Sequence, residues 1–418
     1  MLTTFMGLYT AYVLITIYVS VMQIAYINQT KRNEPILLKR ADFLKAGNYS
    51  VAKEKLKIVN TFLEFVLFMT WLSVGIQYLE TTFIVFEPLY KTLSVVLGFV
   101  IINAIIGMPF EWYSKFVLDE KFGFNKSTIK LYIKDTLITF ALSIVFGSAV
   151  IIGLYFIMIS APMWWLYSFL FIFSVIILIN MLFPTVRALF FDKVTLLDDA
   201  ELNTKIEKIM DETGFVSSGV YVSDASKRDG RLNAYFGGLG KSKRVVLFDT
   251  LIEKLTHQEL LAVLGHELGH FAHGDLYKNI AMVGAMLFGM FALFGNLSET
   301  LFLELGVSNS PSVIMILFML FMPLLSFVMM PIMGVVSRHN EYEADKMGAQ
   351  LGGQLFLAEA LKKLVTENKS YPLSHPLYIF FYYTHPPVLE RLKELGVDIK
   401  TLEDSGLKSE DPLQDELT

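Results

Sequence analysis

The feature that most restricts the fold is the segment Thr136–Val186, in which none of the 51 side chains is charged. An α-helix needs about 20 apolar residues to cross a bilayer. The segment is therefore too long for one membrane helix, and the turn signal at Ser160-Ala161-Pro162 divides it into two. A charge-free run of this length is foreign to water-soluble domains, so we expect an integral membrane protein.

Five further spans have the length and polarity of membrane helices. Phe5–Ile27 carries no charge, and no basic region or small-residue cleavage site accompanies it, so we interpret it as a retained anchor. Asn279–Ser337 contains only two charges and is divided into two spans by the turn at Ser308–Pro311. The remaining two spans are Thr61–Phe86 and Pro88–Phe110. The sequence thus predicts seven transmembrane helices.

Composition supports this class of protein and excludes others. Hydrophobic residues make up 54% of the 418 residues and charged residues 18%, against about 45–50% and about 25% in soluble domains. The net charge of -5 gives no basic surface for nucleic acid. Because the chain has no cysteine, it has no disulfide or thiolate metal site, and a metal would have to use histidine and carboxylate. All seven histidines lie between His257 and His385.

The basic residues predict how the chain is oriented in the membrane. Eight Lys and Arg residues lie in the loop 28–60 and five Lys residues in the loop Glu111–Asp135, whereas the alternate loops hold almost none. The positive-inside rule then places the basic loops in the cytoplasm and the N-terminus outside. With seven spans, residues 187–275 and the segment from Arg338 onward also fall on the cytoplasmic side.

Outside the spans, the pattern predicts a small folded domain made of two pieces. Asp199–Thr213 has helical spacing, and Thr256 with Glu259 forms a capping box for a helix that runs to Ala272. Three short strands are expected at Val220–Ser223, Asn233–Phe236 and Arg244–Phe248. The predicted fold is a mainly α-helical multi-pass membrane protein with a small α+β cytoplasmic domain. Its predicted segments are helices 1–5 with their loops (1–186), a first soluble piece (187–276), helices 6–7 (277–337), a second soluble piece (338–402) and an acidic disordered tail (403–418).

The strongest local signal is the motif His266-Glu267-Leu268-Gly269-His270. Positions i and i+4 share one face of a helix, so His266 and His270 can reach the same metal ion. Glu267 lies close enough to act on a water molecule bound to that metal. Zn²⁺ suits imidazole and carboxylate ligands and keeps an open position in catalytic sites. The alternative is a pair of histidines with only structural contacts on a helix face.

A third ligand is needed, and the residues alone leave several choices open. His273 is near, but the metzincin spacing would require a histidine where Leu276 stands. The other source is the segment Ser337–Asp345, in which Glu341 and Asp345 would share a helix face. One of the two could bind the metal while the other orients a ligand imidazole. Spacing does not choose between Glu341 and Glu343. The alternative without a metal is that these acidic residues form the solvent-exposed start of a charged helix.

Several motifs together resemble the type I CAAX prenyl endopeptidases, integral-membrane zinc metalloproteases of the gluzincin group to which HtpX-type proteases are more distantly related. The matching pieces are His266–His270 followed by Gly274-Asp275, Ser337-Arg338 followed by Glu341 and Asp345, Thr384-His385-Pro386-Pro387, Leu118–Lys126, and Asn233-Ala234-Tyr235. The resemblance spans most of the chain. It implies seven helices around a large intramembrane chamber, with one catalytic Zn²⁺ per chain at the cytoplasmic side.

The resemblance also implies roles for single residues. Glu341, not Glu343, would be the third zinc ligand, with Asp345 supporting a ligand histidine. His385 would stabilise the oxyanion, and Asn233 would hold the substrate backbone. Without the resemblance, His385 would be interpreted as a loop histidine and Asn233 as an ordinary residue at a strand end.

The expected function is zinc-dependent hydrolysis of peptide bonds, in which a C-terminal tripeptide is removed from prenylated CAAX proteins or peptides. The first alternative is an HtpX-type quality-control protease, and the second is a polytopic transporter or receptor with an incidental HExxH motif. The expected partners are the lipid bilayer and a prenylated or membrane-associated peptide. A prokaryotic plasma membrane is favoured over the endoplasmic reticulum because no C-terminal dilysine signal is present. The oligomeric state stays open.

Overall fold

The computed structural model describes residues 1–215, 219–237 and 244–402, so the predicted tail 403–418 lies outside the described residues. Within this part of the chain, seven helices are long and apolar enough to cross a membrane, as predicted. Five are α1 (Leu2–Thr30), α6 (Ile129–Ser160), α7 (Trp164–Phe190), α11 (Asp275–Phe294) and α13 (Pro311–Gly352). The other two are composite. The first consists of α2 (Arg40–Thr70), η1 (Trp71–Gly75) and α3 (Ile76–Thr82). The second consists of α4 (Pro88–Tyr113), η2 (Ser114–Asp119) and α5 (Glu120–Phe122).

Two of these helices extend well beyond the apolar segment that predicted them. Helix α2 begins at Arg40, inside the predicted basic loop, and α13 continues past Ser337 to Gly352 without a break. Hydrophobicity marks only the part of a helix that meets lipid, whereas the helix itself continues as long as its hydrogen bonds and packing allow. The extension of α13 matters most, because Glu341 and Asp345 lie on it.

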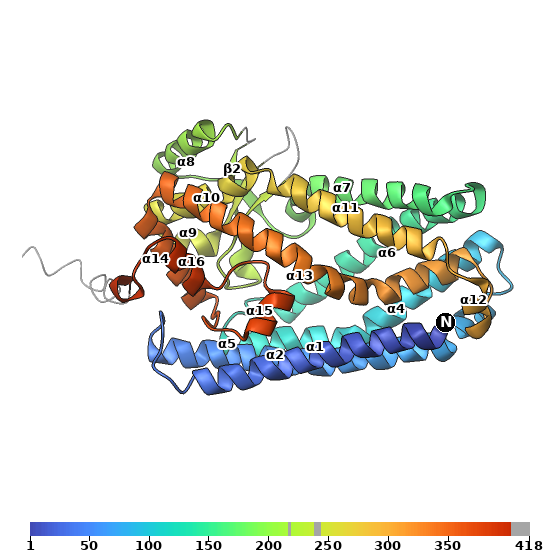
Figure 1. Cartoon of the computed structure of the whole chain (residues 1–418). Helices are drawn as coiled ribbons and strands as arrows, with labels where there is room; N and C mark the ends of the chain where they lie inside the picture. Colours follow the sequence, from blue (N-terminus) through green and yellow to red (C-terminus); the bar gives the residue numbers. More distant parts are fainter. Residues whose placement is uncertain (216–218, 238–243, 403–418) are drawn as a thin grey trace, which may run out of the picture.

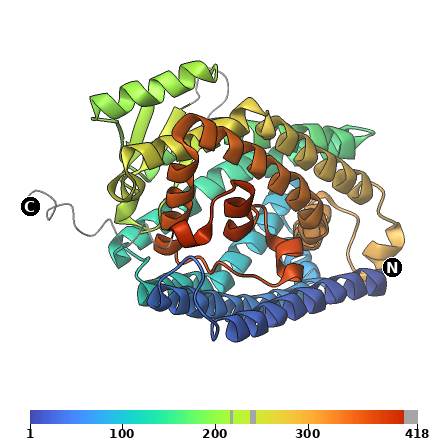
Figure 2. The same ribbon diagram turned by 60° about the vertical axis from the view of Figure 1, so that its left-hand side comes forward.

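The helices are arranged in layers along a common direction (Figure 1). Helices α1 and α2 lie side by side along one edge, α7 and α11 along the opposite edge, and α13 runs between them. Tyr9 of α1 stacks on Phe68 of α2 with ring centroids 3.6 Å apart, and both belong to a buried cluster shared with α13. The soluble elements gather at one end of the bundle, which the turned view in Figure 2 brings forward. The predicted intramembrane chamber stays a prediction.

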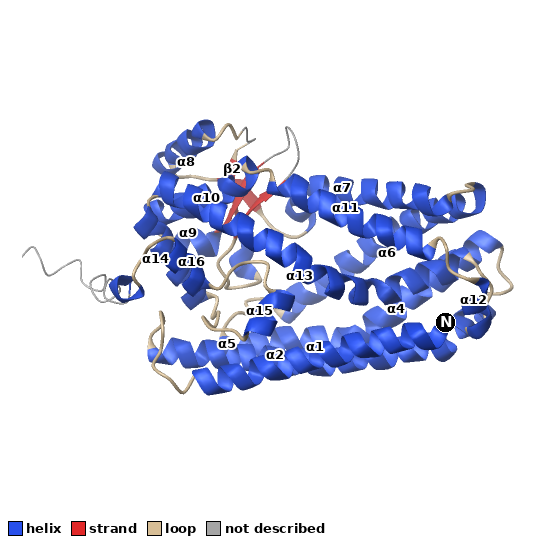
Figure 3. Ribbon diagram, in the orientation of Figure 1, coloured by secondary structure: helices blue, strands red, loops and turns tan. Residues whose placement is uncertain are grey.

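The first soluble piece contains a four-stranded sheet next to the membrane helices (Figure 3). The strands are β1 (Val194–Leu196), β2 (Val220–Ser223), β3 (Ala234–Gly237) and β4 (Arg244–Phe248), in the order β1-β2-β4-β3. Strands β2 and β4 are parallel, and the other two pairs are antiparallel. The three predicted strands are confirmed, whereas the short β1 was not predicted. In the described part of the sheet β3 pairs only with β4, so its other side is an edge.

Helices complete the soluble domain and join its two pieces. The first piece contributes α8 (Ala200–Glu212), the short η3 (Ala225–Lys227), α9 (Asp249–Lys254) and α10 (His257–Ala272). The second contributes α14 (Gln354–Glu367), α15 (Pro376–Tyr382) and α16 (Val388–Glu394), and the small α12 (Glu299–Glu304) lies at the far end of the bundle. Helices α10 and α14 pack on each other and on α13, so elements of the two pieces are in contact.

Candidate metal centre and active site

Helix α10 carries the HExxH motif and begins as the sequence predicts. The Thr256 hydroxyl accepts a hydrogen bond from the Glu259 N–H at 3.3 Å, and the Glu259 carboxylate accepts one from the Thr256 N–H at 2.7 Å. This reciprocal capping box satisfies two of the N–H groups that a helix start leaves without partners. Most of α10 is buried, so the face that carries the two histidines is held in a single orientation.

Small residues let α10 and α13 cross at very short range. A Cβ atom on Gly269 would lie 2.8 Å from Cα of Ala344, and one on Gly352 would lie 2.2 Å from Cα of Ala262. Such distances exclude any side chain at these glycines without a shift of the helices. The crossing therefore brings the backbone of the HExxH helix directly against the helix that carries Glu341.

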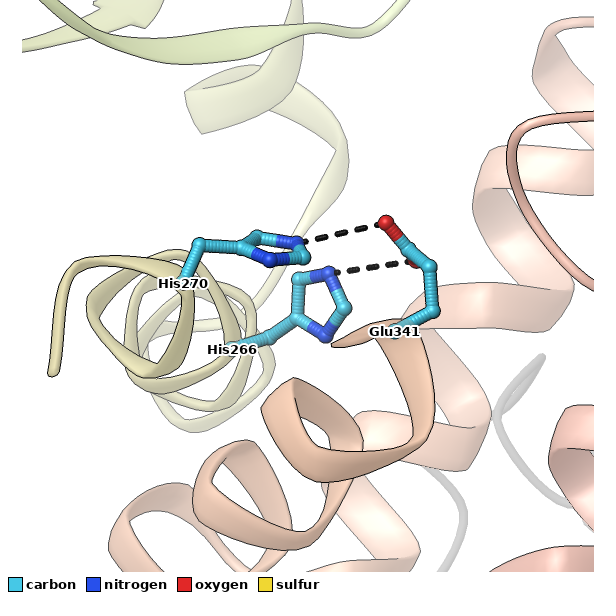
Figure 4. A group of neighbouring side chains, drawn as sticks. All are labelled: His266, His270 and Glu341. Atoms are coloured by element: carbon cyan, nitrogen blue, oxygen red, sulfur yellow. Dashed lines mark ion pairs between the residues drawn. The ribbon is translucent and has the colours of Figure 1, made fainter. Parts of the chain in front are cut away.

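At this crossing two imidazoles and one carboxylate converge. His266 Nε2 lies 3.6 Å from Glu341 Oε2, and His270 Nε2 lies 3.2 Å from Glu341 Oε1 (Figure 4). One potential ligand atom from each residue lies within 4.8 Å of the others. Glu343, the alternative by spacing, points elsewhere and pairs with Lys346 at 2.7 Å. The structure thus brings Glu341, and not Glu343, to the two histidines.

The other nitrogen of each imidazole meets an aspartate. His266 Nδ1 lies 2.9 Å from Asp345 Oδ1, and His270 Nδ1 lies 2.9 Å from Asp275 Oδ2. Metal-bound histidines usually donate their second N–H to such a carboxylate, which fixes the tautomer and leaves Nε2 for the metal. Asp345 therefore lies where the resemblance implied, and Asp275, which belongs to a matching motif, is next to the second histidine.

These residues fit a metal ion. Glu341 is only 2% exposed, and its Oε2 has no hydrogen-bond partner within the described structure. A buried carboxylate oxygen that accepts no hydrogen bond is unfavourable, and a cation in contact with it would add to the charge compensation that Arg391 Nη1 gives from 3.5 Å. Two imidazole nitrogens and one carboxylate are also a donor set found in catalytic metal sites.

The electrostatic surroundings also favour positive charge at this place. Burial by itself would lower the pKa of His270, but its hydrogen bonds with Glu341 and Asp275 raise the pKa to about 9. The carboxylates therefore outweigh desolvation, and they stabilise a positive charge near this imidazole.

Arg391 on α16 is a residue that the sequence did not reveal. Its Nε and Nη2 donate to the two oxygens of Asp345 at 2.8 and 2.6 Å, and its Nη1 lies 3.5 Å from Glu341 Oε2. Such a bidentate pair holds a carboxylate in a defined orientation. In the sequence, Arg391 stands in a short charged helix that resembles any solvated surface helix, so no local signal distinguishes it.

A cavity of about 610 Å³ opens beside the three ligand-type residues, and Glu267 and His385 both line it. His385 Nδ1 lies 2.7 Å from Glu341 Oε1, and its side chain is 66% exposed. A second cavity of about 500 Å³ shares His385 as part of its wall. Asn233 lines this second cavity and not the first, whereas Tyr235 of β3 lines the first. Glu267, His385 and the three ligand-type residues thus share one cavity, whereas Asn233 lines the adjoining one.

Comparison with known proteins agrees with this geometry. Residues 196–397 match the family model for peptidase family M48. Residues 23–193 match the model described as the CAAX prenyl protease N-terminal region with five membrane helices. The two models together cover both the membrane part and the part that contains the HExxH motif.

Similar proteins cover nearly the whole chain. CAAX prenyl protease 1 of Saccharomyces cerevisiae is 32% identical over 416 residues, which cover 90% of this chain and 91% of that protein. A CAAX prenyl protease 1 homolog of Arabidopsis thaliana is 35% identical over 75% of this chain and 76% of its own. The crystal structure of S. mikatae Ste24p has a TM-score of 0.85 and 31% identity, and the match covers 93% of this chain and 97% of that one. This chain therefore belongs to the M48 family of membrane metallopeptidases, together with the CAAX prenyl protease 1 proteins.

Proposed function

We propose that this protein is a zinc-dependent membrane endopeptidase that removes the C-terminal tripeptide from prenylated CAAX proteins or peptides. The observation that carries the proposal is the convergence of His266, His270 and Glu341 beside Glu267, in a chain with seven membrane helices. The curated relatives are named CAAX prenyl proteases, which supports the substrate class.

The proposed cofactor is one Zn²⁺ per chain, held by His266, His270 and Glu341. The donor set of two imidazoles and one carboxylate suits zinc and leaves a position for water. When bound, zinc would polarise the scissile carbonyl group and acidify the water molecule that attacks it. Asp345 and Asp275 hold the two imidazoles in the orientation that binding requires.

Glu267 and His385 carry the proton chemistry in this proposal. Glu267 accepts the proton of the attacking water and returns it to the amine that leaves. His385 donates a hydrogen bond to the oxygen that becomes negative in the transition state. Removal of comparable donors costs about 3–4 kcal/mol of transition-state stabilisation.

The side of β3 that has no strand partner among the described residues supplies a backbone surface for the substrate. An extended peptide can add to a sheet edge through main-chain hydrogen bonds, which select an extended shape and not a sequence. Tyr235 of β3 lines the metal-side cavity and Asn233 the adjoining one, so a peptide along this edge would pass His385. We assign Asn233 to hold the substrate backbone at that point.

The sequence left two alternative functions open. The transporter or receptor alternative is not supported, because the chain belongs to a peptidase family and the two histidines of its HExxH motif meet the carboxylate of Glu341. The HtpX-type alternative shares the proposed metal chemistry and differs in needing no prenyl group. The names of the relatives favour the prenyl protease.

The catalytic side faces the cytoplasm in this proposal, because the basic loops that predict orientation lie at the same end as the soluble domain. The sequence-based preference for a prokaryotic plasma membrane over the endoplasmic reticulum stays a prediction. The relatives named above are all eukaryotic.

A paired peptide assay tests the proposal. The purified chain in lipid is given a farnesylated CAAX peptide and the same peptide without the lipid, with Glu267→Gln as the control. We expect cleavage of the farnesylated peptide only, stoichiometric zinc in both proteins, and no cleavage by the variant. Equal cleavage of both peptides would favour the HtpX-type alternative, and full activity of Glu267→Gln would refute the assignment of the base.

A further inference from the structure

The motif Leu118–Lys126 has no part in the chemistry proposed above, although it is one of the pieces that carry the family resemblance. It forms the end of the third membrane span and the turn that follows. Phe122 and Phe124 pack with Tyr49 of α2 in a small buried cluster. Gly123 closes the turn in the left-handed conformation, with a φ of 82°. The motif is thus a rigid corner built onto two membrane spans.

An ion pair extends from this corner to the soluble domain. Asp119 Oδ1 accepts hydrogen bonds from Tyr49 Oη and from Arg231 Nη2, each at 2.7 Å. The Arg231 guanidinium also lies over the ring of Phe124, 4.1 Å from its centroid. Since the Asp119 and Arg231 side chains are only 19% and 30% exposed, solvent screens this pair less than an open surface pair. We call Asp119, Tyr49, Arg231 and Phe124 the membrane brace.

The membrane brace leads directly into the start of β3. After Arg231, the Leu232 N–H donates to Asn368 Oδ1 at 2.8 Å, and the Leu232 carbonyl accepts from Asn368 Nδ2 at 3.1 Å. The carbonyl of Asn233 then accepts a hydrogen bond from the Phe248 N–H on β4 at 3.1 Å. Each of the three residues 231–233, which lead into β3, is therefore fixed by its own hydrogen bonds, so the main chain here has little conformational freedom.

This connection has a consequence for a substrate that carries a lipid. The lipid would lie among the membrane helices while the peptide lies on β3, so the enzyme must hold the strand at a set height above the bilayer. We infer that Asp119 and Arg231 are positioning residues that tie the start of β3 to the membrane helices and thereby set that height. The inference rests on the proposed function, because it requires a lipidated peptide on β3.

A positioning role and a purely structural role predict different kinetics. If the brace only stabilised the fold, its loss would reduce the fraction of active enzyme and leave KM unchanged. If it positions the strand, its loss raises KM while the metal site and kcat per bound metal stay intact. The two residues would also act as one unit, so their effects would not add.

The test uses the full chain in lipid and the farnesylated peptide, with Arg231→Ala, Asp119→Ala and the double variant. We expect each single change to raise KM about tenfold, the double variant to be no worse than about twice either single one, and kcat per bound metal to change less than about twofold. Hydrogen exchange of the β3 amides should be faster in all three variants. The control is Glu367→Gln, which removes an ion pair with Lys254 next to Asn368 and should leave KM and exchange unchanged.

Unchanged KM, unchanged β3 exchange, or additive effects in the double variant would each overturn the inference. A loss of kcat at constant KM would do the same, because it indicates a structural role. If wild-type enzyme cleaves the farnesylated and unmodified peptides equally, the proposed substrate class is wrong. The β3 exchange then still decides whether the brace holds the strand.

Discussion

Two regions meet at Glu341, and they are held in place by different means. The crossing of α10 and α13 is fixed by backbone contact, with glycines where a Cβ atom would collide. The segment 374–387, which carries His385, is fixed by side chains that reach it from the membrane helices. The His266 side chain at the crossing is 9% exposed, whereas the His385 side chain is 66% exposed. The comparison teaches that the metal-binding geometry is a property of helix packing, while His385 depends on a few polar anchors.

The anchors of the His385 segment are specific. Arg338 Nη1 donates to the carbonyl of Tyr383 at 2.6 Å, two residues before His385. Gln23 of α1 accepts from the His375 N–H at 2.8 Å. From α2, the Glu54 carboxylate accepts from the Tyr378 hydroxyl at 2.6 Å. We therefore expect changes to the ligands and their carboxylate partners at the crossing to abolish or weaken metal binding, and changes at the anchors to lower turnover with the metal still bound.

The largest effect should follow removal of the metal. Chelation should reduce peptide cleavage to background, and added Zn²⁺ should restore it, because the buried carboxylate and imidazoles are preorganised by the crossing. In Glu341→Ala the added metal should restore nothing. Activity assays with elemental analysis measure both results. Retained activity at zero metal content would contradict the proposed chemistry.

The next effect concerns the carboxylate behind His266. Asp345→Asn keeps the shape but removes the charge that pairs with Arg391 and orients the imidazole. Loss of such a partner typically costs about 10–100-fold in metal affinity. Zinc competition titrations measure this, with Glu343→Gln on the same helix as the matched control. Wild-type affinity in Asp345→Asn would show that the histidine does not need this support.

A change at an anchor should act on turnover instead. Arg338→Ala leaves the carbonyl of Tyr383 without its donor, so the His385 loop should lose its fixed position. We expect kcat to fall about tenfold, because one transition-state hydrogen bond is weakened without being deleted. Metal content should stay stoichiometric. If Arg338→Ala also lost its bound metal, the two regions would not act separately and the comparison would be wrong.

The smallest effect should come from Gly352→Ala, which lies at the end of the crossing away from the ligands and should lower stability without removing a ligand. The new Cβ atom would lie 2.2 Å from Ala262 Cα, so the helices must separate. Overpacking of this kind costs about 1–3 kcal/mol of stability. Thermal unfolding of the wild-type protein and the variant measures it. Gly289→Ala is the control, because a Cβ atom there would meet nothing within 4 Å apart from the nearby backbone of its own helix. Equal unfolding temperatures would show that the crossing adapts.

Much of the fold could be predicted because it follows from local chemistry. Charge-free segments predicted the seven spans, the Thr256–Glu259 pair predicted the start of α10, and alternating residues predicted three strands. The ends of α2 and α13 were not predicted: Lys39 before α2 makes no side-chain cap, and the glycine that ends α13, Gly353, lies far beyond the apolar part of that helix. The short strand β1 was missed because three residues carry too little pattern.

For the site, the sequence by itself determined the spacing of His266, Glu267 and His270, because an i, i+4 pair on one helix needs no other element. It left Glu341 and Glu343 equivalent until a family resemblance was considered. Only the tertiary structure decided which carboxylate meets the imidazoles, because the rotation of α13 about its axis is set by the glycines that pack against α10. It also brought in Arg391 and the Asp119–Arg231 pair, whose partners are distant in the chain and come together only when the helices pack.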